Sequence, residues 1–169
     1  MPKAIRLYVH YVDKVNRVIG RCAMYLIFVM MGILLYSSFM KTFLIPSLWT
    51  LEMAQFVMVA YYLIGGAYSM QEDGHVRMDL FYSQWTDKTK TLIDSITILF
   101  LITYLGFLLY GGIFSTQYAL KYSEESYSAW APAMAPIKIL MVIGIFLMLL
   151  QAISCLFKDI AKLKGESIA

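Results

Sequence analysis

Four long stretches of the chain contain no Asp, Glu, Lys, Arg or His, and they determine the class of fold. These stretches are residues 22–40, 53–70, 95–120 and 139–157. A helix of about 18 or more apolar residues is long enough to cross a hydrocarbon core of about 30 Å. In lipid, such a segment must satisfy its backbone hydrogen bonds internally, which favours helices. We therefore expect an all-α integral membrane protein with four transmembrane helices.

The composition agrees with a single membrane domain. Of the 169 residues, 15% are charged, against about 25% in a typical soluble domain. We expect one four-helix domain over residues 1–169, in which an amphipathic cytoplasmic segment (1–21) precedes the spans. The expected spans are 22–40, 51–70, 92–118 and 136–157. The first is taken as a retained helix, because polar and basic residues precede it and no small-residue cleavage site follows.

The distribution of Lys and Arg predicts the orientation. With the N-terminus in the cytoplasm, three cations lie outside, namely Lys41, Lys121 and Lys138, and the other eleven of the fourteen lie inside. The inner ones are Lys3, Arg6, Lys14, Arg17, Arg21, Arg77, Lys88, Lys90, Lys158, Lys162 and Lys164. The positive-inside rule therefore predicts that both termini are cytoplasmic. Trp49, Trp85 and Trp130 fall at predicted span ends, where amphipathic rings anchor a helix at the membrane interface.

The segment 1–21 has the pattern of an amphipathic helix. Its basic residues recur at steps of three or four, and they include Lys3, Arg6, Lys14, Arg17 and Arg21 together with His10. Apolar residues recur on another face, at Ile5, Val9, Val12, Val15 and Ile19. This pattern predicts a helix in the membrane interface, with its basic stripe toward anionic phospholipids. A topology signal with a helical extension is a second interpretation, and both can hold. A nucleic-acid partner is not expected.

The stretch QEDGHVRMDLFY (71–82) holds five ionisable residues between two apolar runs. A zinc site needs three or four ligands dominated by His or Cys, but His75 stands here among carboxylates with Arg77 between them. Nothing nearby forms a nucleophile or an oxyanion site. We expect no enzyme, metal or cofactor. We expect Gly74 to end the second span and Arg77 to pair with a carboxylate or a partner chain; a solvated loop is the alternative.

The spans also argue against a self-contained transporter. Transport sites use ionisable residues or broken helices near the membrane midplane, and these spans have neither. A resident haem is not expected, since His10 and His75 both lie outside the spans. At the head of the second span we expect Thr50 to cap the helix and Glu52 to sit in the first turn, where the helix dipole favours a carboxylate.

The segment SLWTLEMAQFVMVAYYLIGGAYSMQEDGHVRMDLFY closely resembles the signature region of the DctQ-like family. Its members are the small membrane subunits of tripartite ATP-independent periplasmic (TRAP) transporters. The matching positions are Trp49, Glu52, Gly65, Gly66, Gly74, His75, Arg77, Asp79 and Leu80. The segment WAPAMAPIKILMVIGIFLMLLQAI is similar to the family's entry into its fourth helix. Gln55 departs from the pattern, because many relatives carry a basic residue there.

The resemblance implies partners and a role. A large multi-span subunit would hold sodium and the substrate, and a periplasmic binding protein would deliver an organic acid such as a dicarboxylate or sialic acid. The small subunit would scaffold and anchor its partner in the bacterial inner membrane, without a substrate or ion site of its own. Glu52, His75, Arg77 and Asp79 would lock helix ends or dock the large subunit. A scaffold or assembly subunit of an unrelated membrane complex is the alternative.

The outer loops are the parts expected to reach a binding protein. They cover residues 41–50 and 121–135, and the second carries Glu124 and Glu125. These two carboxylates are the candidate contacts with the binding protein, although exposed charges in a loop are often only solvated.

Overall fold

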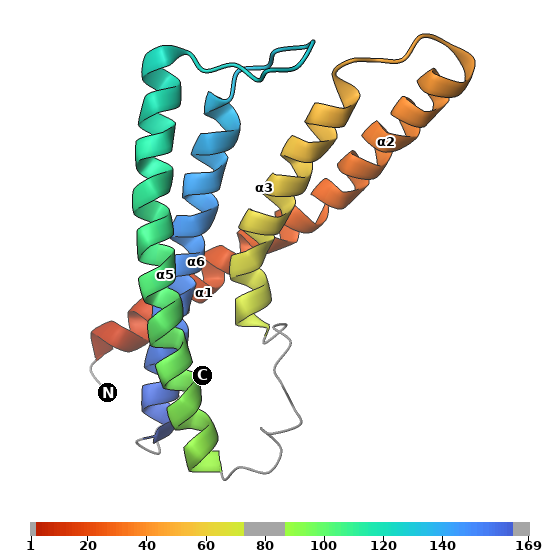
Figure 1. Ribbon diagram of the computed structural model, residues 1–169. Coiled ribbons are helices and arrows are strands. Elements are labelled where there is room, and N and C mark those ends of the chain that lie inside the picture. Colours follow the sequence, from red (N-terminus) through yellow and green to blue (C-terminus); the bar gives the residue numbers. More distant parts are fainter. Residues whose placement is uncertain (1–2, 73–86, 164–169) are drawn as a thin grey trace.

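The chain is all-helical over the residues that the computed structural model describes, 3–72 and 87–163. Its helices are α1 (Lys3–Met24), α2 (Leu26–Phe43), α3 (Thr50–Gln71), α5 (Asp87–Tyr122) and α6 (Ala135–Leu163) (Figure 1). Four stretches in these ranges are long and apolar enough to cross a membrane, namely Ile5–Phe43, Thr50–Gln71, Leu92–Tyr122 and Ala135–Ala161. The predicted all-helical class and the predicted presence of four helices long and apolar enough to cross a membrane are therefore confirmed.

The first candidate span joins two helices. Only Tyr25 separates α1 from α2, and its backbone is itself helical, with φ −72° and ψ −17°. The amide of Tyr25 donates to the Cys22 carbonyl at 3.2 Å, and the amide of Phe28 donates to the Tyr25 carbonyl at 3.1 Å. The chain therefore continues through this point. The 39 residues make about 58 Å of helix at 1.5 Å per residue, so one end projects beyond a hydrocarbon core of about 30 Å.

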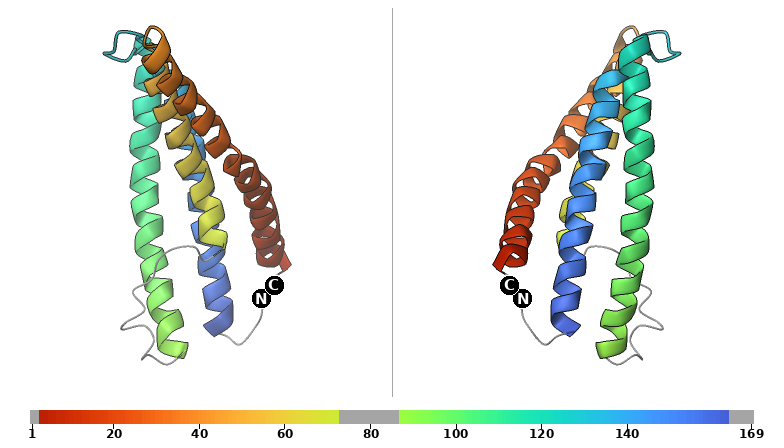
Figure 2. Two further views of the ribbon diagram at one scale, coloured as in Figure 1. Left: turned by 90° about the vertical axis from the view of Figure 1, so that its right-hand side faces the viewer. Right: turned by 90° about the vertical axis from the view of Figure 1, so that its left-hand side faces the viewer.

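Two helices hold the bundle together. α6 packs against α5, α3 and α1, while α3 packs against α1, α2 and α6. A cluster of Leu105, Ile145 and Ala152 forms the buried core between α5 and α6, and Leu63 and Met70 of α3 pack on it. The α2–α3 pair diverges from the α5–α6 pair toward the end that carries the 44–49 connection (Figure 1). The beginning of α1 and the end of α6 both lie toward the opposite end of the bundle (Figure 2).

Glycine brings α3 close to two neighbouring helices. A Cβ built on Gly144 of α6 would lie 2.8 Å from the Leu63 Cβ and 3.0 Å from the Leu63 carbonyl carbon. A Cβ on Gly20 of α1 would lie 2.3 Å from the Tyr68 Cβ. Small residues at such crossings let helix backbones approach closely. α3 is therefore packed between α1 and α6 at separations that only glycine permits.

Candidate functional site

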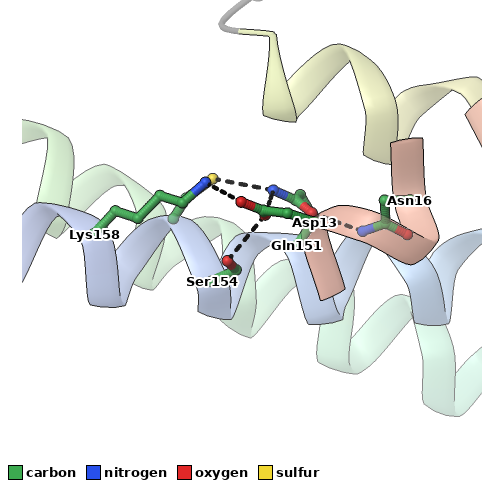
Figure 3. Close-up of polar contacts among 6 residues, drawn as sticks. Asp13, Asn16, Gln151, Ser154 and Lys158 are labelled. Atoms are coloured by element: carbon green, nitrogen blue, oxygen red, sulfur yellow. Dashed lines mark hydrogen bonds and ion pairs between the residues drawn. The ribbon is translucent and has the colours of Figure 1, made fainter. Parts of the chain in front are cut away.

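The main polar site lies where α1 crosses α6. Asp13 and Asn16 are one turn apart on α1, and Gln151, Ser154 and Lys158 recur at steps of three and four along one side of α6. Residues at such spacings share a helix face. Figure 3 shows the five side chains pointing toward one another across the crossing. We call these five residues the α1–α6 polar cluster.

Asp13 is the central acceptor of this cluster. Lys158 Nζ donates to its Oδ2 at 2.6 Å, while Gln151 Nε2 and Ser154 Oγ donate to its Oδ1 at 3.1 Å and 3.3 Å (Figure 3). Asn16 Nδ2 then donates to Gln151 Oε1 at 2.7 Å. The carboxylate thus accepts one ion pair and two hydrogen bonds from α6, and the Gln151 amide uses both ends to bind α1.

Burial makes these contacts important for the packing of the helices. Asn16 is 2% exposed, and Gln151 and Ser154 are 0% exposed. A polar group away from water costs free energy unless it is hydrogen-bonded, and the polar cluster supplies those bonds. An ion pair of this kind is often no more stabilising than an apolar replacement. The main effect of the cluster is therefore to fix the position of α1 on α6, because a shift of α1 along α6 would leave several buried groups without partners.

α3 joins the same end of the bundle through Gln71. With its side-chain amide oriented by its neighbours, Nε2 donates to the Asp13 main-chain carbonyl at 3.3 Å, and Oε1 accepts from Arg17 Nη2 at 3.1 Å. Tyr8 adds a further contact to α6, since its hydroxyl donates to the Leu150 carbonyl at 3.3 Å. α1 is thus bound to both α3 and α6.

A second polar site connects α2 with the start of α3. The Thr50 hydroxyl lies 2.9 Å from both Ser37 Oγ and Ser47 Oγ, and Thr50 is fully buried. Thr50 is the first residue of α3, and no side-chain bond caps the helix at Trp49. The expectation that Thr50 caps this helix is therefore wrong. Its hydroxyl instead joins two segments of the chain.

Two signature residues lie beside this second polar site. The Trp49 ring packs on Tyr36 with ring centroids 5.8 Å apart. Glu52 lies in the first turn of α3, and its Oε2 atom is buried without a hydrogen-bond partner in the described chain. A buried carboxylate oxygen without a donor is costly, so this atom needs a donor that the described residues do not supply.

The loop between α5 and α6 is ordered by its own contacts. Glu124 forms an ion pair with Lys138 at the start of α6, and an isolated bridge joins Glu125 to Ala133. The Ser126 amide donates to the Pro132 carbonyl at 3.0 Å. Glu125 and Trp130 are exposed, and Tyr127 is fully exposed. Of the two predicted carboxylates, Glu124 is therefore already paired within the chain, while Glu125 faces outward.

The comparison with protein families decides the identity of this arrangement. The family model described as "Tripartite ATP-independent periplasmic transporters, DctQ component" matches residues 12–162. The chain belongs to the DctQ family. A search of curated proteins finds no match.

Membership in the DctQ family gives the coarse function. The chain is the small membrane subunit of a TRAP transporter, and this family associates with a large membrane subunit and a binding protein. DctQ proteins are transporter subunits and not an enzyme family. The resemblance to the DctQ family predicted from the signature residues is confirmed, and the family match does not support the alternative of an unrelated membrane complex.

The structure places the remaining predicted residues of this DctQ chain as follows. Lys3, Arg6, Lys14, Arg17 and Arg21 are all exposed on α1. Gly66 faces Met148 of α6, with 2.9 Å between the Met148 Sδ and a Cβ built on Gly66, whereas Gly65 has no such neighbour within 4 Å. Predicted positions outside the described residues are Gly74, His75, Arg77, Asp79, Leu80, Trp85 and Lys164.

Sequence reasoning missed the centre of the polar cluster. Asp13 and Asn16 were not singled out, and Lys158 was counted only as an inner cation. A signal was present, because Asp13 and Asn16 interrupt the apolar face of α1 one turn apart, and Gln151, Ser154 and Lys158 repeat that spacing. Two polar faces on two apolar helices predict that those faces meet.

Proposed function

We propose that this DctQ subunit is a rigid scaffold for the large subunit of a sodium-coupled transporter that takes up an organic acid. One observation carries the proposal. Five polar residues of the described chain are buried, and all of them bond to other parts of the chain; they are Asn16, Ser37, Thr50, Gln151 and Ser154. The buried side-chain atom without a partner in the described chain is Glu52 Oε2, which lies in the first turn of α3 and not in the middle of a span. A transport site needs buried polar groups that are free to bind ions or solute. Here those groups hold helices together.

The proposed orientation places both termini in the cytoplasm of a bacterium. The exposed cations of α1 lie at one end of the bundle, which also carries Lys158, whereas Lys41 and Lys121 end α2 and α5 at the other. This separation supports the positive-inside assignment. In this orientation α1 runs along the inner interface, where its basic residues meet anionic phospholipids, and the 44–49 and 123–134 connections face the periplasm.

The loop between α5 and α6 carries two carboxylates, and they differ in what they can offer a binding protein. Because Glu124 pairs with Lys138, its charge is largely compensated within the chain. Glu125 and the fully exposed Tyr127 ring lie beside it on the ordered loop. We propose Glu125 and Tyr127, more than Glu124, as the contacts of this loop with the binding protein.

Glu52 is proposed as a docking residue for the large subunit, because its buried Oε2 has no donor in the described chain. We expect Glu52→Gln to leave the thermal stability of the isolated chain unchanged or slightly raised. Co-purification with the large subunit should fall about tenfold, since a hydrogen bond to a charged group contributes about 1.5–3 kcal/mol. The exposed Glu125→Gln is the matched control and should retain the pair. A loss of stability in the isolated chain would instead make Glu52 an internal structural residue.

Uptake by reconstituted vesicles tests the scaffold proposal itself. Vesicles with an inward sodium gradient would receive the large subunit with or without this chain, together with the loaded binding protein. The acid would first be identified by thermal-shift screening of organic acids on the binding protein. We expect at least tenfold slower uptake without the small subunit, at equal amounts of inserted large subunit. Equal rates would refute the requirement, and uptake by the small subunit alone would refute the absence of its own solute path.

A further inference from the structure

An apolar groove runs between α1 and α6 beside the polar cluster. It has a volume of about 500 Å³ and is lined by Leu7, Tyr8, Tyr11 and Val12 of α1 and by Leu150 of α6. The Tyr8 hydroxyl already donates to the Leu150 carbonyl, so apart from the Tyr11 hydroxyl the remaining lining is hydrocarbon and aromatic ring. Sites for small ligands commonly have volumes of about 300–1,000 Å³. The groove is therefore large enough for an apolar chain and offers nothing for a polar solute.

α1 has three faces: one buried in the protein, one apolar and exposed, and one basic. The groove opens on the exposed apolar face. Val9, Val12 and Asn16 are buried toward α3 and α6. Leu7 and Tyr11 belong to a second, exposed apolar face, with 71% and 68% of their surfaces accessible. The third face is basic and borders the second.

The basic face lies next to the mouth of the groove. Lys3 precedes Leu7 by four residues, and Lys14 follows Leu7 by seven and Tyr11 by three. These spacings place both lysines on the same side of the helix as Leu7, and both are exposed. An occupant of the groove would thus have its apolar part against Leu7 and Tyr11 and its polar end at a basic border, within reach of a lysine such as Lys14.

The position of the groove along α6 falls within one leaflet of a membrane. Leu150 lies eight residues before Lys158, which is about 12 Å along α6, and it falls inside the uncharged stretch 139–157. The base of the groove is therefore at the level of hydrocarbon, and its basic border is near the charged end of the span.

We propose that this groove binds an acyl chain of an anionic phospholipid from the cytoplasmic leaflet, with its phosphate at the basic border of the groove, beside Lys14. The inference rests on the orientation given under Proposed function. Charge complementarity selects this occupant, because a basic border attracts an anionic headgroup while the lining accepts only hydrocarbon. The bound lipid would fill the gap between α1 and α6 and so complete the contact that the polar cluster begins.

The acyl-chain part is tested by native mass spectrometry of the complex with the large subunit, released from phosphatidylglycerol nanodiscs. Leu7→Ala/Tyr11→Ala should reduce retained phosphatidylglycerol about fivefold or more, because most of the apolar contact is removed. Val18→Ala is the matched control, since Val18 is 59% exposed on the same helix but does not line the groove. Unchanged retention in the double variant, or equal loss in the control, would overturn the proposal.

The headgroup part is tested in nanodiscs that contain equal amounts of phosphatidylglycerol and phosphatidylcholine. Lys14→Gln should lower the preference for phosphatidylglycerol about fivefold, the effect of about 1 kcal/mol per lysine near an anionic surface. Lys121→Gln, at the opposite end of the bundle, should leave the preference unchanged. A photocrosslinker at residue 11 that labels the large subunit and not lipid would show a protein occupant and overturn the proposal. Co-purification of the two subunits is measured separately, so a failure of the scaffold proposal can be distinguished from a failure of the lipid proposal.

Discussion

Replacing Asp13 by alanine should release α1 from α6 and lower the stability of the chain by about 2–5 kcal/mol. The carboxylate accepts from Lys158, Gln151 and Ser154. Its removal leaves two buried donors and one partly buried ammonium group without their acceptor. Each unsatisfied buried group costs about 1–3 kcal/mol, and breaking one side of a buried ion pair costs about 3–5 kcal/mol. The lower part of the combined range is expected, because the Asp13 and Lys158 side chains retain 20% and 27% exposure.

Two readouts separate this effect from general damage. The first is the thermal stability of the purified chain in detergent, compared with Glu125→Ala, which removes an exposed carboxylate and should have almost no effect. The second is maleimide labelling of Cys155, which lies one turn after Gln151, in a Cys22→Ser background because Cys22 is exposed. Detachment of α1 should speed the labelling of Cys155. Unchanged stability and unchanged labelling would show that the polar cluster does not hold α1.

Asp13→Asn gives an internal comparison. The amide keeps one oxygen for the Gln151 and Ser154 donors but loses the charge that attracts Lys158. We expect Asp13→Asn to lose less stability than Asp13→Ala. The difference between the two variants would separate the contribution of the hydrogen bonds from that of the ion pair. Exchanging the charges as Asp13→Lys/Lys158→Asp should restore little, because the Gln151 Nε2 donor would then face an ammonium group that accepts nothing.

The helices and their number could be predicted from the sequence because the membrane imposes a local rule. Each uncharged stretch must form its backbone hydrogen bonds within itself, so its helical structure does not depend on contacts far away in the chain. Helix ends are less constrained, since charged residues continue a helix readily in water. α5 accordingly runs from Asp87 to Tyr122, although the predicted span was 92–118.

The direction of the apolar face of α1 could not be read from periodicity. The spacing of Val9 and Val12 predicted an amphipathic helix in the membrane interface without stating what covers its apolar face, and these two residues are buried within the protein. Periodicity shows that a face is apolar but does not show whether lipid or protein covers it. The placement of α1 in the membrane interface remains a prediction, now carried by its exposed basic residues and by Leu7 and Tyr11.

Contacts between residues far apart in the sequence could not be predicted either. Asn16 and Gln151 are 135 positions apart, and no local pattern states which buried polar residues will pair. The same holds for glycines. The signature directed attention to Gly65 and Gly66, whereas the tightest crossings occur at Gly20 and Gly144. A glycine is needed where another backbone passes, and that place is known only once the helices are packed.

The crossing at Gly144 leads to the second large prediction. We expect Gly144→Ala to destabilise the chain by about 1–3 kcal/mol, the range for overpacked cores, and Gly144→Val to cost more. The new methyl group would meet the Leu63 backbone at 3.0–3.1 Å, and a backbone cannot move aside as a side chain can. α3 would have to separate from α6, which would also loosen the packing of Leu63 on the core cluster.

A graded series makes this prediction specific to the crossing. Gly65→Ala should be neutral or stabilising by up to about 1 kcal/mol, because nothing lies within 4 Å of the new Cβ and alanine favours helix. Gly66→Ala should have a small effect, since its neighbours are the flexible end atoms of Met148. Thermal stability in detergent should therefore fall in the order Gly65→Ala, Gly66→Ala, Gly144→Ala. Equal effects at the three sites would mean that α3 and α6 do not cross at Gly144, and the scaffold would then lack the close contact on which its rigidity depends.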